Sequence, residues 1–146
     1  RAVVSRRLEL PLMSQLAQTA GEVPLWLCHG PDPDPALAEA WDGVGARRFA
    51  CDLAGRQLDM AAVLRSLGEA GLTRIFCEGG GGLAASLLAA GLVDEMVVFS
   101  AGMAIGAEGV PGIGALGLGT LDEARRFRLD EVRAVDGDVM SRWIRA

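Results

Sequence analysis

The chain has 146 residues and a mass of 15.2 kDa, 51% of its residues are hydrophobic, and its mean hydropathy is +0.30. This length fits one domain with a substantial core, which excludes a wholly disordered protein. The net charge is −5, and the basic residues are all arginines scattered along the chain. A nucleic-acid-binding protein would show a basic stripe, so nucleic acid is not an expected partner.

The cellular setting is inferred from apolar runs, cysteines and the first residue. The longest nearly apolar stretch, Gly79–Val93, is shorter than the ~20 residues that a membrane span needs. Three widely spaced cysteines and one histidine form neither a disulfide framework nor a metal-ligand set, and a reducing cytoplasm is expected. Because Arg1 leads directly into a strand-like run, we expect a piece of a longer protein, with residues 1–146 forming one domain or part of it.

Strands and helices are predicted to alternate along the first hundred residues. The expected strands are Ala2–Ser5, Val23–His29, Ala46–Cys51, Thr73–Cys77 and Glu95–Ser100. The expected helices are one or two turns capped by Ser14 and running to Ala20, one capped by Asp34 and running to about Asp42, one capped by Asp59 and running to Ala70, and Gly81–Ala90. This alternation indicates an α/β domain with a mostly parallel central sheet, in which Ala46–Cys51 is an edge strand.

The end of the chain has a different pattern. A glycine-rich loop is predicted over residues 101–119. Two strands, Phe127–Ala134 and Val139–Arg145, then flank the turn signal Asp136-Gly137-Asp138. Such a signal predicts an antiparallel hairpin.

The segment with the clearest chemical signal is Leu72–Ser86, with the sequence LTRIFCEGGGGLAAS. It consists of an expected strand, the carboxylate of Glu78, four consecutive glycines and an alanine-rich helix. Glycines let a ligand approach the backbone, and the unpaired amides at a helix start attract phosphate. The alternative is a tight strand-to-helix turn packed against a neighbouring segment.

The glycine run is not a Rossmann fingerprint, although Gly79, Gly81 and Ala84 match its spacing. That fingerprint needs an acidic residue at the end of the next strand, about 20 positions further on. Here Asp94 and Glu95 lie at the start of the expected strand and not at its end. Any nucleotide is therefore expected to be held in another way.

The run EGGGGLAASLLAAGLVDEMVVFSAG, followed by Ile105-Gly106 and Pro111, resembles a known family. It is similar to the C-terminal reductase domain of the bacterial bifunctional riboflavin-biosynthesis pyrimidine deaminase/reductase. The tail DGDVMSRWIR and the segment Ala2–Leu12 resemble that family less specifically. The resemblance covers most of the chain.

The resemblance implies a dihydrofolate-reductase-like, three-layer α/β/α fold and a homodimer. It implies NADPH-dependent reduction of the ribosyl group of 5-amino-6-(5-phosphoribosylamino)uracil to ribityl in the cytoplasm, as one activity of a multifunctional enzyme. Glu78 would contact the substrate. The cofactor phosphates would lie against Gly80, Gly81, Gly82, Leu83, Ala84, Ala85 and Ser86. No catalytic side chain is assigned.

Two departures from the family pattern affect the cofactor site. Where the family often has Asp-Ser after its strand, this chain has Ser5-Arg6. Arg6 either meets the 2′-phosphate of NADPH as a bidentate donor or is simply solvated. The family domain also begins with a strand, helix and strand that precede anything in this sequence.

The remaining candidates are expected to be structural. His29 is interpreted as a loop histidine, and Cys77 as a buried packing residue and not a nucleophile. Asp94 and Glu95 point in opposite directions on a strand, so capping or a dimer contact is favoured over paired catalysis. A second function from another class stays open, in which the chain is a non-catalytic assembly module whose glycine turn only packs helix on sheet.

Overall fold

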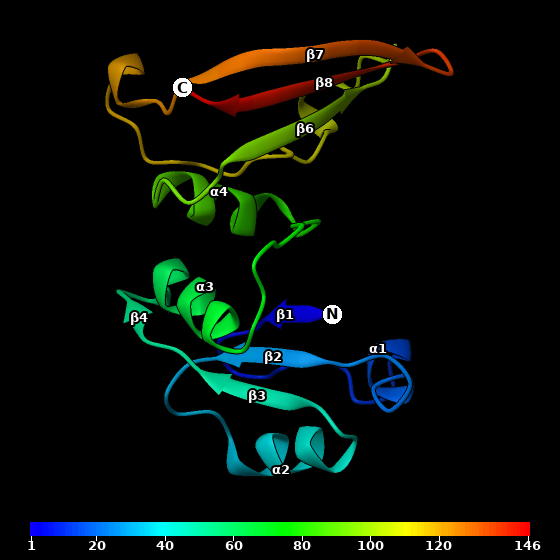
Figure 1. Ribbon diagram of the computed structural model, residues 1–146, viewed down its shortest axis with the longest axis vertical. Coiled ribbons are helices and arrows are strands. Elements are labelled where there is room, and N and C mark those ends of the chain that lie inside the picture. The colour runs from blue at the N-terminus through cyan, green and yellow to red at the C-terminus, as the bar shows by residue number, and fades with distance from the viewer. The chain divides into compact units, whose positions relative to one another are not determined.

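The computed structural model describes all 146 residues, Arg1–Ala146, and the chain divides into two units, Arg1–Ile75 and Phe76–Ala146. Each unit has its own three-stranded sheet, parallel in the first and antiparallel in the second (Figure 1). None of the helices has the length and apolar character that crossing a membrane requires.

The first unit is a parallel sheet between two helices. Its elements are β1 (Ala2–Val4), α1 (Gln15–Gln18), β2 (Trp26–His29), α2 (Pro35–Gly43), β3 (Arg47–Ala50), β4 (Leu53–Ala54), β5 (Gln57–Leu58) and α3 (Met60–Glu69). The sheet order is β1-β2-β3, while β4 and β5 form a separate short antiparallel pair. Within this unit α2 and α3 lie on opposite faces of the sheet (Figure 1). Three layers are the expected arrangement for an α/β domain.

Aspartate caps define the starts of the two covering helices. The Asp34 carboxylate accepts a hydrogen bond from the Ala36 amide at 2.8 Å, and Pro35 occupies the first helical position of α2. The Asp59 carboxylate accepts one from the Ala61 amide at 2.9 Å at the start of α3. Each cap satisfies an amide that the helix cannot pair itself. Both caps were predicted, and both predictions are confirmed. The predicted side-chain cap by Ser14 is wrong, because Ser14 precedes α1 but its hydroxyl makes no hydrogen bond.

The core of the first unit is centred on Trp41 of α2, which is fully buried. Trp41 packs with Leu27 of β2 and with Leu8, which follows β1. Its indole Nε1 donates to the Leu8 carbonyl at 3.3 Å, so its polar atom is satisfied in the core. Leu8 itself is fully buried at φ 60°, a backbone conformation that is uncommon for a branched side chain. The core therefore holds the turn after β1 in one conformation.

The second unit combines one helix with an antiparallel sheet. Its elements are α4 (Gly81–Ala89), β6 (Glu95–Ser100), the 3₁₀ turns η1 (Gly106–Glu108) and η2 (Leu121–Glu123), β7 (Phe127–Val135) and β8 (Asp138–Arg145). The sheet order is β6-β8-β7. Asp136 and Gly137 form the turn between β7 and β8 with φ values of 45° and 94°. Positive φ at both central positions is what a two-residue hairpin turn requires, and the predicted hairpin is confirmed.

The α/β class, the parallel strands and the C-terminal hairpin are confirmed, but one predicted strand is wrong. Residues 73–77 form no strand, and no backbone hydrogen bond involves Thr73–Gly79. The composition of this segment suits a strand, but a strand exists only where a neighbour pairs with it. The β4–β5 pair was not predicted, since two residues on each side of the Gly55-Arg56 turn are too short to show a period.

Candidate functional site

The glycine run ends at the start of α4, and two amides there have no partner. Gly80 is the residue before the first helical turn, and it offers no side chain to cap the helix. The amides of Leu83 and Ala84 both bond to the Gly80 carbonyl, at 3.0 and 3.1 Å. The amides of Gly81 and Gly82 come before any carbonyl that an α-helix could offer them. They form a small donor site with partial positive charge.

This helix start differs from those of α2 and α3. Those two helices carry a capping carboxylate, from Asp34 and Asp59. An aspartate in the same place on α4 would occupy the free amides and repel an anion. Its absence leaves the start of α4 able to accept a negatively charged group.

The four glycines have two different roles. A Cβ on Gly79 would come within 2.5 Å of the Leu83 side chain, and one on Gly81 within 2.5 Å of the Pro111 carbonyl. Gly81 also accepts a hydrogen bond from the Gly114 amide at 2.8 Å. At Gly80 and Gly82, by contrast, a Cβ would meet nothing within 4 Å. Gly79 and Gly81 are therefore required for packing, while Gly80 and Gly82 border open space.

The remaining residues of the predicted phosphate segment lie along α4. Leu83 and Ala84 are half-buried, whereas Ala85 is buried. The Ser86 hydroxyl donates to the Gly82 carbonyl at 3.0 Å, which is the carbonyl one turn back. Of this segment, the residues with backbone amides that have no partner within the chain are Gly80, Gly81 and Gly82, of which Gly81 and Gly82 belong to the helix. The roles of the others toward a cofactor stay predictions.

Glu78 lies two residues before Gly80, and its side chain is exposed. It makes no hydrogen bond or ion pair within the chain. A carboxylate held near an anion site but not bonded to it can accept hydrogen bonds from hydroxyl or ring N–H groups of a ligand.

Arg6 belongs to the first unit, in the turn after β1. It is half-buried, and its Nη1 donates to the Arg56 carbonyl at 2.8 Å. Arg56 occupies the turn between β4 and β5. Arg6 is thus held in place on one side of its guanidinium and is not a freely solvated side chain.

His29 is not the loop histidine that was expected. It is the last residue of β2 and is only 4% exposed. Its ring nitrogens contact the Gly30 carbonyl at 2.6 Å and Arg48 Nη1 at 3.3 Å. Arg48 in turn donates two 2.7 Å bonds to Asp42, which lower the pKa of that carboxyl and raise that of the guanidinium. His29 is fixed by a structural polar network that joins β2, β3 and α2.

The cysteines divide into a buried pair and an exposed one. Cys28 and Cys51 are buried in the first unit. Burial, with Cys51 close by, raises the pKa of the Cys28 thiol to about 12 and keeps it protonated. Cys77 is exposed, so the prediction that it packs in a core is wrong. The error follows from the strand that does not form, because without a sheet partner this segment has no covered face.

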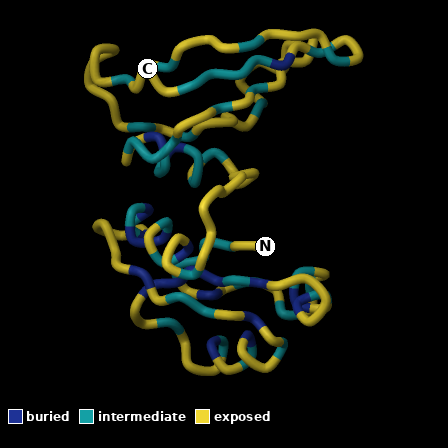
Figure 2. Tube along the Cα trace, in the orientation of Figure 1, coloured by how far each residue is buried: buried dark blue, intermediate teal, exposed yellow.

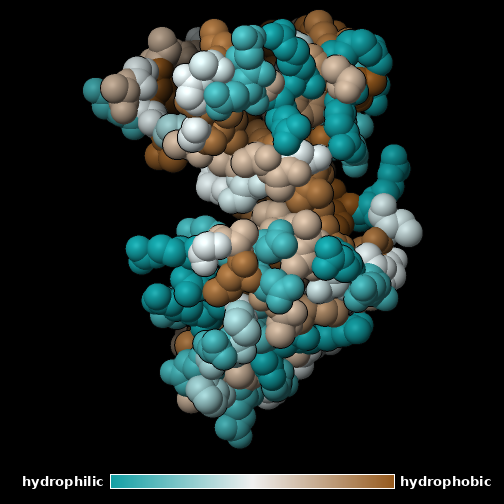
Figure 3. All heavy atoms as spheres, turned by 90° about the vertical axis from the view of Figure 1, so that its left-hand side faces the viewer, coloured by the Kyte–Doolittle hydropathy of each residue, from teal (hydrophilic) through white to brown (hydrophobic).

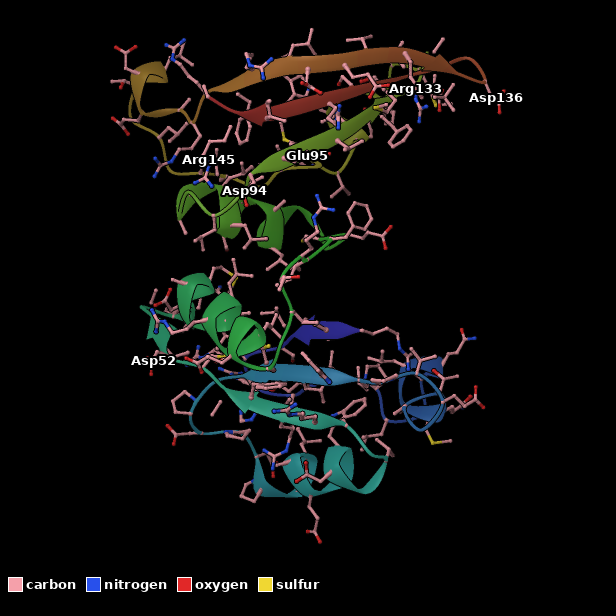
Figure 4. All side chains as sticks on the ribbon, viewed as in Figure 1. Asp52, Asp94, Glu95, Arg133, Asp136 and Arg145 are labelled. Atoms are coloured by element: carbon pink, nitrogen blue, oxygen red, sulfur yellow. The ribbon has the colours of Figure 1, made fainter.

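Asp94 makes an ion pair within the second unit, which is a structural contact but not the capping or dimer contact that was favoured for it. Its carboxylate pairs with the Arg145 guanidinium, and its carbonyl accepts the Arg145 amide at 2.9 Å (Figure 4). The contact fixes the end of β8 to the start of β6. A cavity of about 230 Å³ lies beside it at the carboxyl end of α4, with Leu88, Arg125 and Phe127 among its lining residues. The glycine turn is at the opposite end of this helix.

Together, the fold and this site define an α/β domain with a phosphate-compatible helix start. The chain belongs to the RibD C-terminal domain family, whose model matches residues 1–141. The family resemblance seen in the sequence is thereby confirmed.

Three known proteins illustrate the relationship. The riboflavin biosynthesis protein RibD of Actinobacillus pleuropneumoniae is 26% identical over 145 residues, which are 99% of this chain and 38% of that protein. The solved structure of Acinetobacter baumannii RibD matches with a TM-score of 0.78 at 21% identity, over 100% of this chain and 37% of the other. A pyrimidine reductase-like protein from Corynebacterium diphtheriae matches with a TM-score of 0.81 at 17% identity, over 99% of this chain and 60% of the other.

The two structures show that the fold is that of RibD reductase domains, which is the dihydrofolate-reductase-like fold expected from the sequence. The chain spans less than two fifths of the length of the RibD proteins that it matches.

Proposed function

We propose that this chain is the reductase part of a riboflavin-biosynthesis enzyme. It would use NADPH to reduce the ribosyl group of 5-amino-6-(5-phosphoribosylamino)uracil to ribityl. Membership of the RibD C-terminal domain family supports this, as do the names of the relatives, a riboflavin biosynthesis protein and a pyrimidine reductase-like protein. Family membership also favours an enzyme over the assembly module. The cytoplasmic location and the homodimer stay predictions.

The observation that carries the proposal is the uncapped start of α4. Two free amides, of Gly81 and Gly82, point to a group with several acceptor oxygens, and a cofactor diphosphate is such a group. The open space at Gly80 and Gly82 would let that group approach the backbone. A nicotinamide cofactor therefore fits the residues that are present.

The chemistry divides between cofactor and protein. A bound nicotinamide cofactor supplies the hydride that reaches C1′ of the sugar. The chain's own part is to bind and orient: the α4 amides hold phosphate, and the Glu78 carboxylate accepts hydrogen bonds from sugar hydroxyls or from ring N–H groups. No side chain of the chain needs to form a covalent bond to the substrate.

The decisive experiment is Gly82→Ala in the full natural protein, followed by titration of NADPH. An added methyl group meets nothing within the chain, so alanine in this helix stabilises the fold by about 0.5 to 1 kcal/mol. The same methyl group would stand where the phosphates approach, and we expect NADPH affinity to fall at least about tenfold.

Gly68→Ala is the matched control. Gly68 is in α3, it is exposed, and its added Cβ also meets nothing. We expect the same gain in stability with unchanged NADPH affinity. Equal NADPH affinity in both variants would show that the cofactor does not use the start of α4.

Glu78→Gln tests the substrate role separately. Loss of the charge should raise KM for the pyrimidine substrate while NADPH binding stays constant. An unchanged KM would remove Glu78 from the substrate site without affecting the assignment of α4.

A further inference from the structure

The cavity at the carboxyl end of α4 lies within the second unit, and neither the glycine turn nor the proposed chemistry accounts for it. Its volume is about 230 Å³. Sites for drug-sized molecules occupy ~300 to 1,000 Å³, whereas an apolar cavity of ~150 Å³ is large enough for benzene. The cavity therefore suits a compact ligand about the size of one substituted ring.

One part of the lining is apolar. Leu88, in the last turn of α4, is buried, while Val93 and Phe127 are half-buried. Val93 lies in the connection between α4 and β6, and Phe127 is the first residue of β7. Apolar side chains from three parts of the chain thus border the same space, and covering them with the apolar part of a ligand is favourable. A ligand that consisted only of charged groups would leave this part of the cavity unused.

The other part of the lining carries three guanidinium groups, which belong to Arg125, Arg126 and Arg145. Arg145 is already occupied, because it donates to the Gly91 carbonyl at 3.1 Å and pairs with the Asp94 carboxylate (Figure 4). Arg126 lies 3.9 Å from the Asp122 carboxylate, and both of these side chains are exposed. Arg125 has no ion pair within the chain. Its positive charge is therefore the one in this cavity that no carboxylate balances.

Arg125 is held against the turn that ends α4. Its Nη2 donates to the Ala89 carbonyl at 3.4 Å. A Cβ on Gly91 would lie 3.3 Å from the Cζ and Nη2 atoms of Arg125, so the guanidinium packs directly on the glycine backbone. Its Nε and Nη1 have no partner within the chain, and a guanidinium has donors on all three nitrogens. The group is thus positioned by the fold and still has donors for a ligand, which reduces the cost of binding.

We infer that this cavity binds a small monocarboxylate with an apolar or aromatic body. The carboxylate accepts hydrogen bonds from Arg125 and, more weakly, from the exposed Arg126. The apolar body lies against Leu88, Val93 and Phe127. A single negative charge matches the single unbalanced guanidinium, whereas a phosphate dianion would be repelled by the carbonyls at the end of α4. The cavity and the glycine turn are at opposite ends of this helix, so the carboxylate site is separate from the proposed cofactor site.

The test uses benzoate as the probe and benzamide as a neutral control of nearly the same shape. NMR titration of the full natural protein gives the two affinities. We expect benzoate to bind in the millimolar range or more tightly. Benzamide should bind about tenfold more weakly or worse, because it cannot form a charge-assisted bond with Arg125.

Two variants separate the charge of the site from its volume. Arg125→Gln removes the guanidinium and should weaken benzoate binding about tenfold or more. Val93→Phe fills the cavity without changing any charge, and it should also weaken benzoate binding. Arg133→Gln is the matched control, because Arg133 is exposed near the turn end of the β7–β8 hairpin, away from Arg145 (Figure 4). It should bind benzoate as the wild type does. Circular dichroism checks that each variant is folded.

Three results would overturn the inference. The first is a wild-type protein that does not bind benzoate at millimolar concentrations, which is expected if Arg125 only caps α4. The second is that Arg125→Gln binds benzoate as tightly as Arg133→Gln does. The third is competition between benzoate and NADPH, which would place benzoate at the cofactor site. Benzoate binding that depends on Arg125 and is unchanged by NADPH would support the carboxylate site, whether or not the protein reduces the pyrimidine substrate.

Discussion

The two units of the chain reach stability by different means. Most of the buried hydrophobic side chains belong to the first unit, whereas the second buries only Ala85, Leu88 and Met140 to that degree (Figure 2). The second unit also exposes more large apolar side chains, and in Figure 3 brown apolar residues reach the surface among the hydrophilic ones.

The first unit is a parallel sheet covered on both faces, so burial is its main source of free energy. The second depends more on backbone hydrogen bonds of its antiparallel ladders and on local ion pairs. The glycine turn before α4 therefore lies in the unit with the smaller hydrophobic core, where few buried side chains restrict the backbone.

The largest difference between the two units should appear in the rates at which their cysteines are labelled. Cys77 is exposed and should react with iodoacetamide at pH 8 as fast as a free peptide does. Cys28 is buried with a pKa raised to about 12, so it should react only when the first unit opens. With an unfolding free energy of at least about 5 kcal/mol, the rates should differ by ~10³-fold or more. Mass spectrometry of timed samples gives the rates, and equal rates would show that the first unit has no stable core.

The next largest effect is expected from Trp41→Ala. It removes a fully buried indole and the donor to the Leu8 carbonyl, and should cost about 3 to 5 kcal/mol in the free energy of unfolding. Urea denaturation followed by circular dichroism measures the loss.

Two further variants separate the causes of the stability loss in Trp41→Ala. Trp41→Phe keeps most of the packing and should lose only about 1 to 2 kcal/mol. Met140→Ala in the second unit should cost about 2 kcal/mol, at the low end for such a change, because few buried neighbours surround that side chain. A Met140→Ala loss as large as that of Trp41→Ala would contradict the contrast between the units.

Gly81→Val tests packing within the second unit. The new side chain would collide with the Pro111 carbonyl, so we expect a loss of about 1 to 3 kcal/mol in the free energy of unfolding. Gly82→Val, one residue further on, meets open space, and valine is a slightly better helix former than glycine, so the free energy of unfolding should change by less than about 1 kcal/mol. Thermal denaturation distinguishes them. If both variants have the same melting temperature, the loop around Pro111 does not pack on the start of α4.

The smallest effect is a pH-dependent one in the first unit. Arg48 lowers the pKa of Asp42, first by hydrogen bonding and then by charge, so the pair stabilises the folded state above the ordinary aspartate pKa of about 4. This contribution is lost as the pH falls through the lowered pKa. Because the Asp42 side chain is 50% exposed and screened by solvent, Asp42→Asn should cost no more than about 1 kcal/mol at pH 7.

The control for this variant is Asp122→Asn, which removes a carboxylate 3.9 Å from Arg126 on the open surface of the second unit. Its effect should be close to zero at every pH. Asp42→Asn should approach wild-type stability as the pH falls through the lowered pKa of Asp42, and a difference in the free energy of unfolding that stays constant through the whole acid range would contradict the role of the ion pair.

Features that depend on a few adjacent residues could be predicted from the sequence. Asp34 and Asp59 cap their helices because the acceptor and the amide it bonds are two residues apart. The Asp136-Gly137 turn likewise needs only its own backbone conformations. The start of α4 after a glycine run belongs to the same class.

Features that depend on residues distant in the sequence could not be predicted. The segment at Thr73 has strand composition but no strand to pair with. The burial of His29 depends on Arg48 and Asp42, which reach it only after the chain has crossed from β2 to β3. The packing role of Gly81 depends on Pro111. The hydrogen bond from Arg6 to the Arg56 carbonyl depends on a hairpin too short to show a pattern. In each case the local sequence is compatible with several environments, and the fold selects one.

The turn at Asp136-Gly137 also bears on the order of events during folding. Its two strands are adjacent along the chain, and hairpins of this kind close in ~1 to 10 μs. The parallel pairing of Ala2 with Trp26 must instead wait for a long crossover to be ordered, which slows folding. The red and orange ribbon of Figure 1 is therefore expected to acquire structure before the parallel sheet of the first unit, although β7 and β8 follow that sheet in the sequence.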